Sequence, residues 1–505
     1  MCADFSRSRF SPHAISSRRN PMDCLGLISL TVLATLSGQA LAQQALPQHE
    51  PAGTNINDHG QFQEVFGCWE GPDGHLEGGP FLVPADPQAL EIREAVEHAN
   101  RGIPDNRVDM VIVGDGYTAD EMDIFHADAT NIAESFFRYE PFKSYKPYFK
   151  FTQVEVVSNE SGVDNDPTQG ISRDTALDMG YWCGGTERAL CVDVAKAYAA
   201  AAAAPHIDQV IAISNSSKYG GVGYPSNNLG TSAGHNSAAV EIVIHEMGHS
   251  LGDLADEYTY GGPTTYTGAE LGPVDVSILS RQEQLDQERK WWRWMDASFS
   301  EFDGPVSTYE GGNYSEFGVF RPSNNSMMRS LSRPFNVVSA ERLLRMIYRE
   351  VDPIDDGTPD GSVVEPDEVL WVMPMQPLNH DLQVLWYLDD EVILSAVQET
   401  ELDLSTLSLS SGEHTIKVEV VDPTPWVRAE VIRRGFMREV RTYTVNACSS
   451  EADLNQDGNL DFFDVSAFLT AYNAQEPLAD MNNDGAYSFF DVSAFLVMFS
   501  EGGCP

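Results

Sequence analysis

Between residues 106 and 352 the hydrophobic positions follow two periods in turn, one typical of buried strands and one typical of helices. Short continuous apolar runs predict buried strands at 109–113, 149–157 and 209–213. Helical spacing predicts helices at 120–137, at 237–251 and through the alanine run 199–204, where Pro205 ends the pattern. Strands that alternate with helices predict an α/β domain built on a twisted sheet.

The pattern changes beyond residue 352. Residues 353–366 are rich in Pro, Gly and Asp and almost free of apolar side chains, which predicts a linker. From 367 to 447 apolar and polar residues alternate, and 382–394 predicts two strands on either side of the pair Asp389-Asp390. About 80 residues of such strands predict an all-β immunoglobulin-like sandwich.

The last segment, residues 448–505, contains an internal repeat. The hexapeptide at 453–458 recurs in closely similar form at 480–485. The octapeptide FFDVSAFL stands at both 462–469 and 489–496. This duplication marks the segment as a domain of its own.

The N-terminus has the composition of an export signal. Arg18 and Arg19 precede an apolar run at 25–36, and Ala40-Leu41-Ala42 offers a small-x-small cleavage site. Residues 1–42 are therefore predicted to be a signal peptide, and the mature protein is expected to be secreted or held at the cell surface. Residues 43–105 are polar and predict a small N-terminal module. No later stretch reaches ~18 uninterrupted apolar residues, so no transmembrane segment is expected.

Charge and cysteine content narrow the classes of partner and compartment. The 505 residues include 76 acidic and 31 basic side chains, a formal net charge of −45. Such a field repels phosphate, so binding to nucleic acid is not expected. An exported protein can keep disulfides. Cys183 with Cys191 and Cys448 with Cys504 are the expected pairs, which leaves Cys68 over.

Candidate chemistry is concentrated in the run EIVIHEMGHSLGDLADEY, which begins at Glu241. His245 and His249 are four residues apart, so on a helix both imidazoles leave the same face and can approach one Zn²⁺. Glu246 can reach a water beside the metal and act as general base. The alternative is a chance H-E-x-x-H on a surface helix. The apolar residues that precede His245 instead predict a buried helix, on which these polar groups need a partner.

Four motifs together resemble the IgA-peptidase-like zinc metallopeptidases, a metzincin-type family. They are VDMVIVGDGYTADEM, YGGVGY, HEMGHSLGDLADEY and RPSNNSMMR. The resemblance covers about residues 106–350, and the sandwich region resembles that family's usual appendage. It implies Zn²⁺ held by the two helix histidines, Glu246 as base and endopeptidase chemistry. It does not establish that immunoglobulin is the substrate.

The third zinc ligand is left open between two acids. Gly252 stands where metzincins turn the chain back towards the metal, but Ala255 occupies the position of their third ligand and cannot bind. Asp256, the next residue, is the first choice, since a carboxylate is an acceptable zinc ligand, and Glu257 is the second. The alternative is that both acids only cap or solvate the loop.

Two further features fit the resemblance. Met327 or Met328 is expected to form the methionine turn beneath the zinc without ligating it, although a methionine pair is more often plain core filler. Tyr219, Gly220 and Gly221 are expected to form the edge strand above the cleft, to which a substrate strand could add. A glycine-rich turn is the alternative for that stretch.

Each copy of the C-terminal repeat fits D-x-N-x-D-G with an acid at loop position twelve, a spacing that supplies the oxygen ligands of Ca²⁺. The first predicted set is Asp453, Asn455, Asp457, the Asn459 carbonyl and Asp464. The second predicted set is Asp480, Asn482, Asp484, the Ala486 carbonyl and Asp491. An acidic turn without a metal is the alternative, but it would have to occur twice in one register.

The repeat pair resembles a type I dockerin, which implies a small α-helical calcium module that binds a partner. Loop positions ten and eleven, often polar in dockerins, are here the pairs Phe462-Phe463 and Phe489-Phe490. The expected partner is therefore left open between a cohesin-like protein and a cell-surface anchor.

Together these features predict a secreted zinc endopeptidase that acts on extracellular proteins or glycoproteins. The alternative is a surface adhesion protein in which the sandwich and calcium module bind and the zinc fold is inactive. Intact His245, Glu246 and His249 favour the enzyme.

Overall fold

A computed structural model describes residues 62–70, 76–84, 106–260, 262–410, 412–447, 450–455 and 460–501. The predicted signal peptide and the predicted pair Cys448–Cys504 lie outside these residues, and the side chain of Cys68 is not described. Among the helices of the described part, none has the length and apolar character that crossing a membrane requires.

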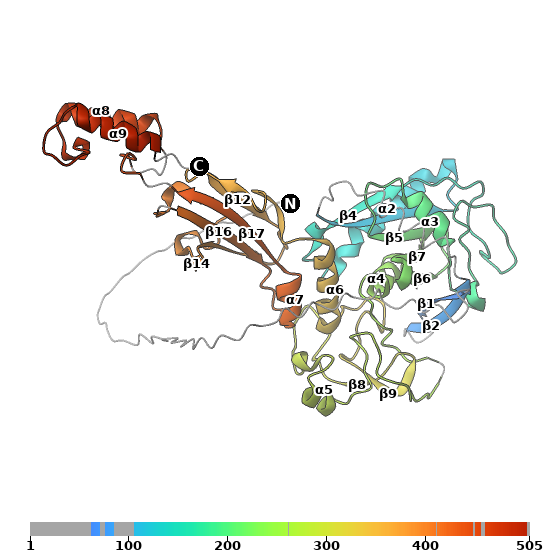
Figure 1. Cartoon of the computed structure of the whole chain (residues 1–505). Helices are drawn as coiled ribbons and strands as arrows, with labels where there is room; N and C mark the ends of the chain where they lie inside the picture. The colour runs from blue at the N-terminus through green and yellow to red at the C-terminus, as the bar shows by residue number, and fades with distance from the viewer. Residues whose placement is uncertain are drawn as a thin grey trace, which may run out of the picture. The chain divides into compact units, whose positions relative to one another are not determined.

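A seven-stranded mixed sheet forms the centre of the first half of the chain (Figure 1). Its strands are β1 (Phe62–Glu70), β2 (Leu76–Pro84), β3 (Val108–Asp115), β4 (Phe149–Val154), β5 (Gln209–Ser214), β6 (Gly221–Tyr224) and β7 (Leu229–Ala233). Their order is β2-β1-β6-β7-β5-β3-β4. The strands from β7 to β4 are parallel, whereas β6 and the β1–β2 hairpin run antiparallel to their neighbours.

Helices cover both faces of this sheet, because alternate residues of its buried strands point to opposite sides. Val108, Met110 and Ile112 of β3 pack in one core with side chains of α2 (Met122–Ser135), α4 (Ala239–Ser250) and α6 (Val337–Glu350). Val111 and Val113 pack in a second core with α3 (Val194–Ala201). The predicted α/β arrangement of strands and helices is therefore present.

The glycine-rich stretch does not form an edge strand. Its second half is β6, which lies inside the sheet between β1 and β7. A Cβ on Gly221 would lie 2.4 Å from Ile242 Cγ2 of α4, and a Cβ on Gly223 would lie 2.6 Å from Glu246 Oε2. The glycines therefore allow α4 to approach the sheet closely, and the prediction of an open edge was wrong because β1 takes that position.

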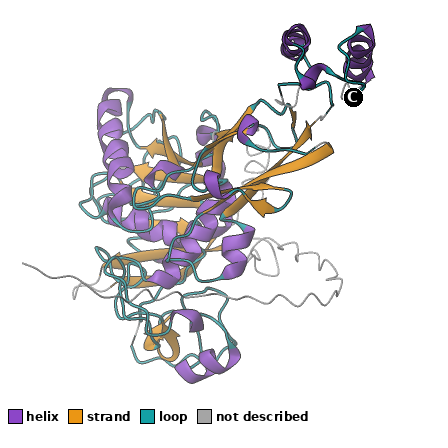
Figure 2. Cartoon of the chain, turned by 90° about the vertical axis from the view of Figure 1, so that its left-hand side faces the viewer, coloured by secondary structure: helices purple, strands orange, loops and turns teal. Residues whose placement is uncertain are grey.

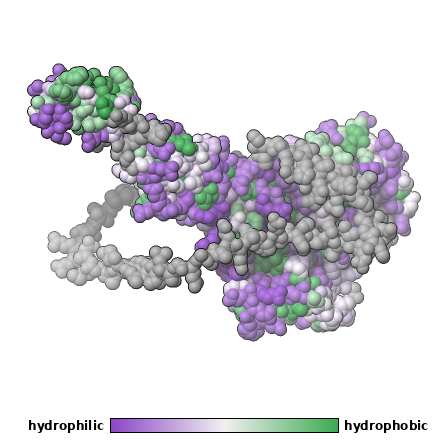
Figure 3. Space-filling model, viewed as in Figure 1, coloured by the Kyte–Doolittle hydropathy of each residue, from purple (hydrophilic) through white to green (hydrophobic). Residues whose placement is uncertain are grey.

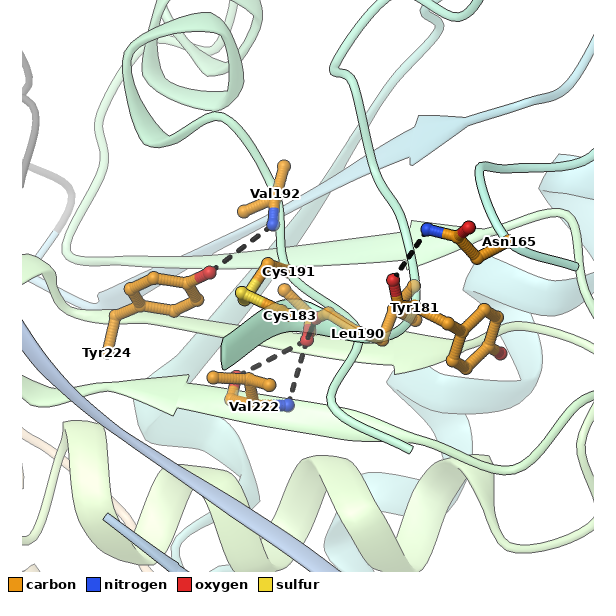
Figure 4. Close-up of a disulfide and its surroundings, with 9 residues drawn as sticks. Asn165, Tyr181, Cys183, Leu190, Cys191, Val192, Val222 and Tyr224 are labelled. Carbon is orange, nitrogen blue, oxygen red and sulfur yellow. Dashed lines mark hydrogen bonds between the residues drawn. A yellow bond between two sulfur atoms is a disulfide. The ribbon is translucent and has the colours of Figure 1, made fainter. Parts of the chain in front are cut away.

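A disulfide closes the loop above β6 (Figure 4). Cys183 and Cys191 form the expected bond. The Val192 N–H donates to the Tyr224 hydroxyl over 3.3 Å, and the Thr231 hydroxyl donates to the Leu190 carbonyl over 2.6 Å. The loop is thus fastened to the strands on which α4 packs.

Between α4 and α6 the chain forms α5 (Arg281–Gln287) and a small hairpin of β8 (Tyr309–Gly312) and β9 (Ser315–Arg321). Beyond α6 come two sheets, of order β10-β12-β15 and β11-β17-β16-β13-β14 (Figures 1 and 2). Their elements are β10 (Ile354–Gly357), β11 (Val363–Val364), β12 (Val369–Pro374), β13 (Gln383–Leu388), β14 (Glu391–Val392), β15 (Glu401–Asp403), β16 (Gly412–Val421), α7 (Glu430–Gly435) and β17 (Arg438–Ala447).

In this region, the segments in which apolar and polar residues alternate form strands with one buried face. Ile416, Val418 and Val420 of β16 are fully buried while their neighbours are not. The two strands predicted around Asp389-Asp390 are the hairpin β13–β14. Residues 353–366, predicted to be a linker, contribute β10 and β11, because two of their few apolar residues, Ile354 and Val364, are buried in the core.

The repeat segment contains two helices, α8 (Phe462–Ala474) and α9 (Phe489–Glu501), which lie side by side (Figures 1 and 2). Phe468 and Phe495, the same position of the two octets, stack with their ring centroids 4.2 Å apart. The Phe pairs at the two helix starts are 65–75% exposed and contribute to an apolar surface on this module (Figure 3).

Candidate metal centre

Helix α4 presents its two histidines to one point. Every residue of the helix is buried, since it packs between the sheet and α6. His245 and His249 are one turn apart, and their Nε2 atoms are 3.2 Å from each other. The predicted common face of the two imidazoles is therefore present in the fold.

Backbone carbonyls fix the protonation pattern of both rings. His245 Nδ1 lies 3.0 Å from the carbonyl oxygen of Met327, and His249 Nδ1 lies 2.8 Å from that of Leu254. A carbonyl oxygen can only accept, so each Nδ1 carries the proton. Each Nε2 of the neutral rings is then a bare acceptor that points towards the other.

The chain reverses directly after α4 and brings Asp256 to the same point. Asp253, with a φ of 50°, makes the left-handed turn, although Gly252 was the residue expected there. Asp256 Oδ1 lies 3.1 Å from Nε2 of His245 and 3.3 Å from Nε2 of His249. Its side chain is fully buried.

Charge couples these three groups. Burial acts to raise the pKa of Asp256, but the two histidines outweigh it and hold that pKa well below its usual range. Burial acts to lower the pKa of His249, but the Asp256 carboxylate prevails and raises it to about 9. The cluster therefore favours positive charge at its centre.

The three groups fit a divalent metal ion. Their ligand atoms all lie within 4.8 Å of one another, and no second cluster of this kind occurs among the described residues. With both Nδ1 atoms protonated, Nε2 of each ring and Oδ1 of Asp256 would repel one another at about 3 Å unless a proton or a metal ion lies between them. Two imidazole nitrogens and one carboxylate oxygen form a donor set suited to zinc.

Glu246, the candidate base, is fully buried between α4 and β6. The absence of a side chain on Gly223 leaves the space that its carboxylate occupies, because a Cβ there would lie 2.6 Å from Oε2. Glu246 is adjacent in sequence to His245, and Gly223 leaves room for its carboxylate. The carboxylate therefore lies next to the cluster.

Glu257, the second choice for the third ligand, points elsewhere. Its carboxylate accepts hydrogen bonds of 2.7 Å from the Ser326 hydroxyl and from Asn336 Nδ2. Burial, together with the charge of nearby Asp275, raises the pKa of the Glu257 carboxyl above its usual range. The structure therefore brings Asp256, and not Glu257, to the histidines, and both acids are buried rather than solvating a loop.

The methionine pair lies directly beneath α4. Met327 and Met328 are both fully buried. Met327 supplies the carbonyl that orients His245, and a Cβ on Gly248 would lie 2.4 Å from Met328 Sδ. The segment thus supports the histidine helix through one hydrogen bond and one close contact.

Two aromatic residues near the cluster were not predicted. The ring of Phe66 on β1 stacks on the ring of His249, with centroids 5.1 Å apart. The hydroxyl of Tyr314 donates to Asp256 Oδ2 over 2.5 Å. Nothing in their local sequence marks either residue, because each arrives from a segment far from α4. His235, which precedes α4, pairs with Asp128 and Asn215.

In the second predicted calcium loop, the carboxylates accept hydrogen bonds from backbone N–H groups of the loop itself. Asp491 accepts from the N–H groups of Asn482 and Ser488, and Asp480 accepts from those of Asp484 and Gly485. In the first loop, Asp464 likewise accepts from the N–H groups at 454, 455 and 461. Asp457 and Asn459 of the first loop lie outside the described residues. These carboxylates are not among the groups that cluster as a metal site, so calcium binding stays a prediction.

Comparison with known families agrees with the chemistry of the cluster. Residues 96–302 match the profile of the IgA peptidase M64 family. The matched stretch includes α4 and Asp256 and ends before Tyr314 and Met327. M64 peptidases are metallopeptidases, so the match supports a peptidase, that is, a hydrolase, with a cluster able to bind a metal ion. No curated protein matched the chain.

Proposed function

We propose that this protein is a secreted, zinc-dependent endopeptidase that hydrolyses peptide bonds in extracellular proteins or glycoproteins. The observation that carries the proposal is the cluster of three inward-facing ligand atoms on His245, His249 and Asp256, within a stretch that matches a peptidase family. The disulfide Cys183–Cys191 supports export, since such bonds persist in oxidising compartments.

In this proposal His245 and His249 would hold the ion through Nε2, and Asp256 would hold it through Oδ1, in the manner of a metzincin. A bound zinc ion supplies Lewis-acid polarisation to a peptide carbonyl and to water. The Nδ1 bonds to the carbonyls of Met327 and Leu254 keep both imidazoles oriented for that task.

Glu246 acts as the general base. Its carboxylate takes a proton from the attacking water as the oxygen–carbon bond forms at the substrate carbonyl. It then delivers that proton to the departing amine as the peptide bond breaks, and so returns to its ionised form. Because the residue is fully buried, bulk water does not compete for this proton.

The C-terminal module serves as an anchor in this proposal. Each of the loops at 453–464 and 480–491 would hold one calcium ion, and the module would attach the enzyme to a cohesin-like or cell-surface partner. The internal repeat and the hydrogen-bonded second loop support this part of the proposal.

The test is a matched pair of substitutions on one helix. Glu246→Gln should keep the fold and bound zinc but lower kcat/KM on a peptide substrate by roughly 10²-fold or more, because it removes the base. Glu241→Gln is the control, since Glu241 pairs with Arg138 at the start of the same helix. Near-normal turnover by Glu246→Gln, with zinc bound, would exclude Glu246 as the general base.

A further inference from the structure

The turn between β8 and β9 consists of two residues in an unfavourable conformation. Gly312 pairs with Ser315 across it, and the central residues Asn313 and Tyr314 have φ values of 45° and 64°. Two-residue turns of this hand favour Gly at the second position, because a side chain there crowds the backbone. A tyrosine in that position is an observed outlier, and such outliers concentrate at functional sites.

Backbone hydrogen bonds hold this turn on the segment that carries Asp256. The Asn313 N–H donates to the Asp256 carbonyl over 2.8 Å, and the Tyr314 N–H donates to the Tyr258 carbonyl over 2.9 Å. In return the Tyr260 N–H donates to the Tyr314 carbonyl over 3.2 Å. The turn therefore has one defined register against the residues that follow the metal cluster.

A buried arginine supports the hairpin from behind. Arg321, at the end of β9, donates through Nη1 to the carbonyls of Glu310 and Gly311, each over 2.7 Å. These bonds cross the hairpin just before the turn. The position of the turn is thus determined on both sides.

As a result, the two oxygens of Asp256 have different partners. Oδ2 accepts from the Tyr314 hydroxyl over 2.5 Å, and Oδ1 faces the two histidine nitrogens at 3.1 and 3.3 Å. The Tyr314 ring packs edge-on against Tyr258, with centroids 5.5 Å apart, which limits its rotation. A carboxylate held in this way presents Oδ1 to the point that the two histidines share and directs Oδ2 towards Tyr314.

We propose that Tyr314 is a positioning residue of the metal centre, which orients Asp256 so that Oδ1 alone faces the ion. This inference rests on the proposed function for the identity of that ion as zinc. Outer groups that bind a ligand residue typically change metal affinity about 10–100-fold when they are removed.

The test compares zinc affinities of the full chain, measured by competition with a chromogenic chelator. Tyr314→Phe should weaken zinc binding about 10–100-fold. Tyr309→Phe is the matched control and should bind zinc as the wild type does, because its hydroxyl donates to the Pro305 carbonyl on the same hairpin. An unchanged affinity for Tyr314→Phe would overturn the proposal.

A second variant separates positioning from a role in the turn. Tyr314→Gly suits the left-handed conformation, so the metal-free protein should melt no lower than Tyr314→Phe while its zinc affinity falls by a similar factor. Wild-type zinc affinity in the glycine variant would mean that only the turn matters, which also overturns the proposal.

Activity at saturating zinc completes the experiment. A positioning role predicts that kcat of Tyr314→Phe returns close to the wild-type value once the site is filled. A kcat that stays low with zinc bound would place the hydroxyl on the reacting atoms and overturn the assignment. If the wild type binds zinc but cleaves no peptide, the proposed function fails, and the affinity comparison still decides the role of Tyr314.

Discussion

The cluster of His245, His249 and Asp256 and the loop at 480–491 hold their carboxylates in opposite ways. The cluster joins α4 to Asp256, to the Met327 carbonyl and to the Tyr314 hydroxyl, which lie 82 and 58 residues from their partners. In the loop, the hydrogen bonds of Asp480 and Asp491 reach no further than nine residues. One site is assembled by the tertiary fold, and the other is a property of a short peptide.

Burial is common to both sites, because Asp491 is as buried as the cluster, but the groups that satisfy the buried charges differ. His245, His249 and Asp256 are at most 1% exposed, so their charges are deprived of water and depend on one another. In the loop, backbone N–H groups satisfy the acids, and the bond from Ser488 is the main cause of the lowered pKa of Asp491. The difference predicts that removing one partner group should weaken the site severely in the cluster and only mildly in the loop.

The largest expected effect comes from removing one kind of ion at a time. A chelator selective for zinc should abolish peptide hydrolysis and leave hydrogen exchange in α8 and α9 unchanged, since nitrogen ligands and all-oxygen loops select different ions. A calcium-selective chelator should raise exchange in α8 and α9, because the emptied acids repel one another. Loss of hydrolysis on calcium removal would break the comparison and point to calcium within the catalytic domain.

The next effect concerns two neighbouring acids. Asp256→Asn removes the carboxylate between the histidines and should weaken zinc binding by at least the roughly 10–100-fold typical of outer partners. Glu257→Gln is the matched variant, and its amide can still bond to Ser326 and Asn336, so its zinc content should stay at the wild-type level. Metal analysis with the reverse pattern would assign the ligand to Glu257.

The smallest effect tests whether distance along the chain matters without a metal. Buried Asp422 accepts from the hydroxyls of Tyr145 and Tyr348 and pairs with His380. Asp422→Asn should lower the free energy of unfolding by roughly 2–4 kcal/mol, because it disturbs a buried network assembled from distant segments. Asp389→Asn, at an exposed turn, should cost less than about 1 kcal/mol.

The pH dependence of stability provides a second test of the comparison between Asp422 and Asp389. Burial acts to raise the pKa of Asp422, but His380 and the tyrosines hold it below its usual range. An acid whose pKa is lowered by folding stabilises above its unfolded pKa, about 3.9, and loses that contribution as pH falls through the lower folded value. Urea midpoints of wild type and Asp422→Asn should therefore differ by a constant amount from pH 7 to 5 and converge below about pH 4. A gap that closes already near pH 6 would assign the effect to another group.

Local patterns were sufficient where the interactions are local. The periods of two and 3.6 residues located β3, β5, α2 and α4 closely, and the H-E-x-x-H spacing identified the face of α4. The pair Cys183–Cys191 was also correct, since the two cysteines are only eight residues apart. The match to a peptidase family agrees with the chemistry inferred from that helix.

Predictions failed where a distant segment decided the outcome. β6 was expected at the edge, but β1, more than 150 residues earlier in the chain, pairs with it. Residues 353–366 were expected to be a linker, yet Ile354 and Val364 reach a core formed by other strands. In each case a short polar or glycine-rich stretch takes its structure from what packs against it.

By itself the sequence identified the two histidines of the candidate centre and a candidate base, since His245, Glu246 and His249 are close together on one helix and share a local geometry. Only the tertiary structure placed Asp256 beside the histidines and Glu257 away from them, because two adjacent side chains leave a loop in different directions according to what each contacts. The same is true of Tyr314, which reaches Asp256 through a turn held by backbone bonds that no short-range pattern encodes. Buried polar groups need partners, and the fold alone determines which distant partner arrives.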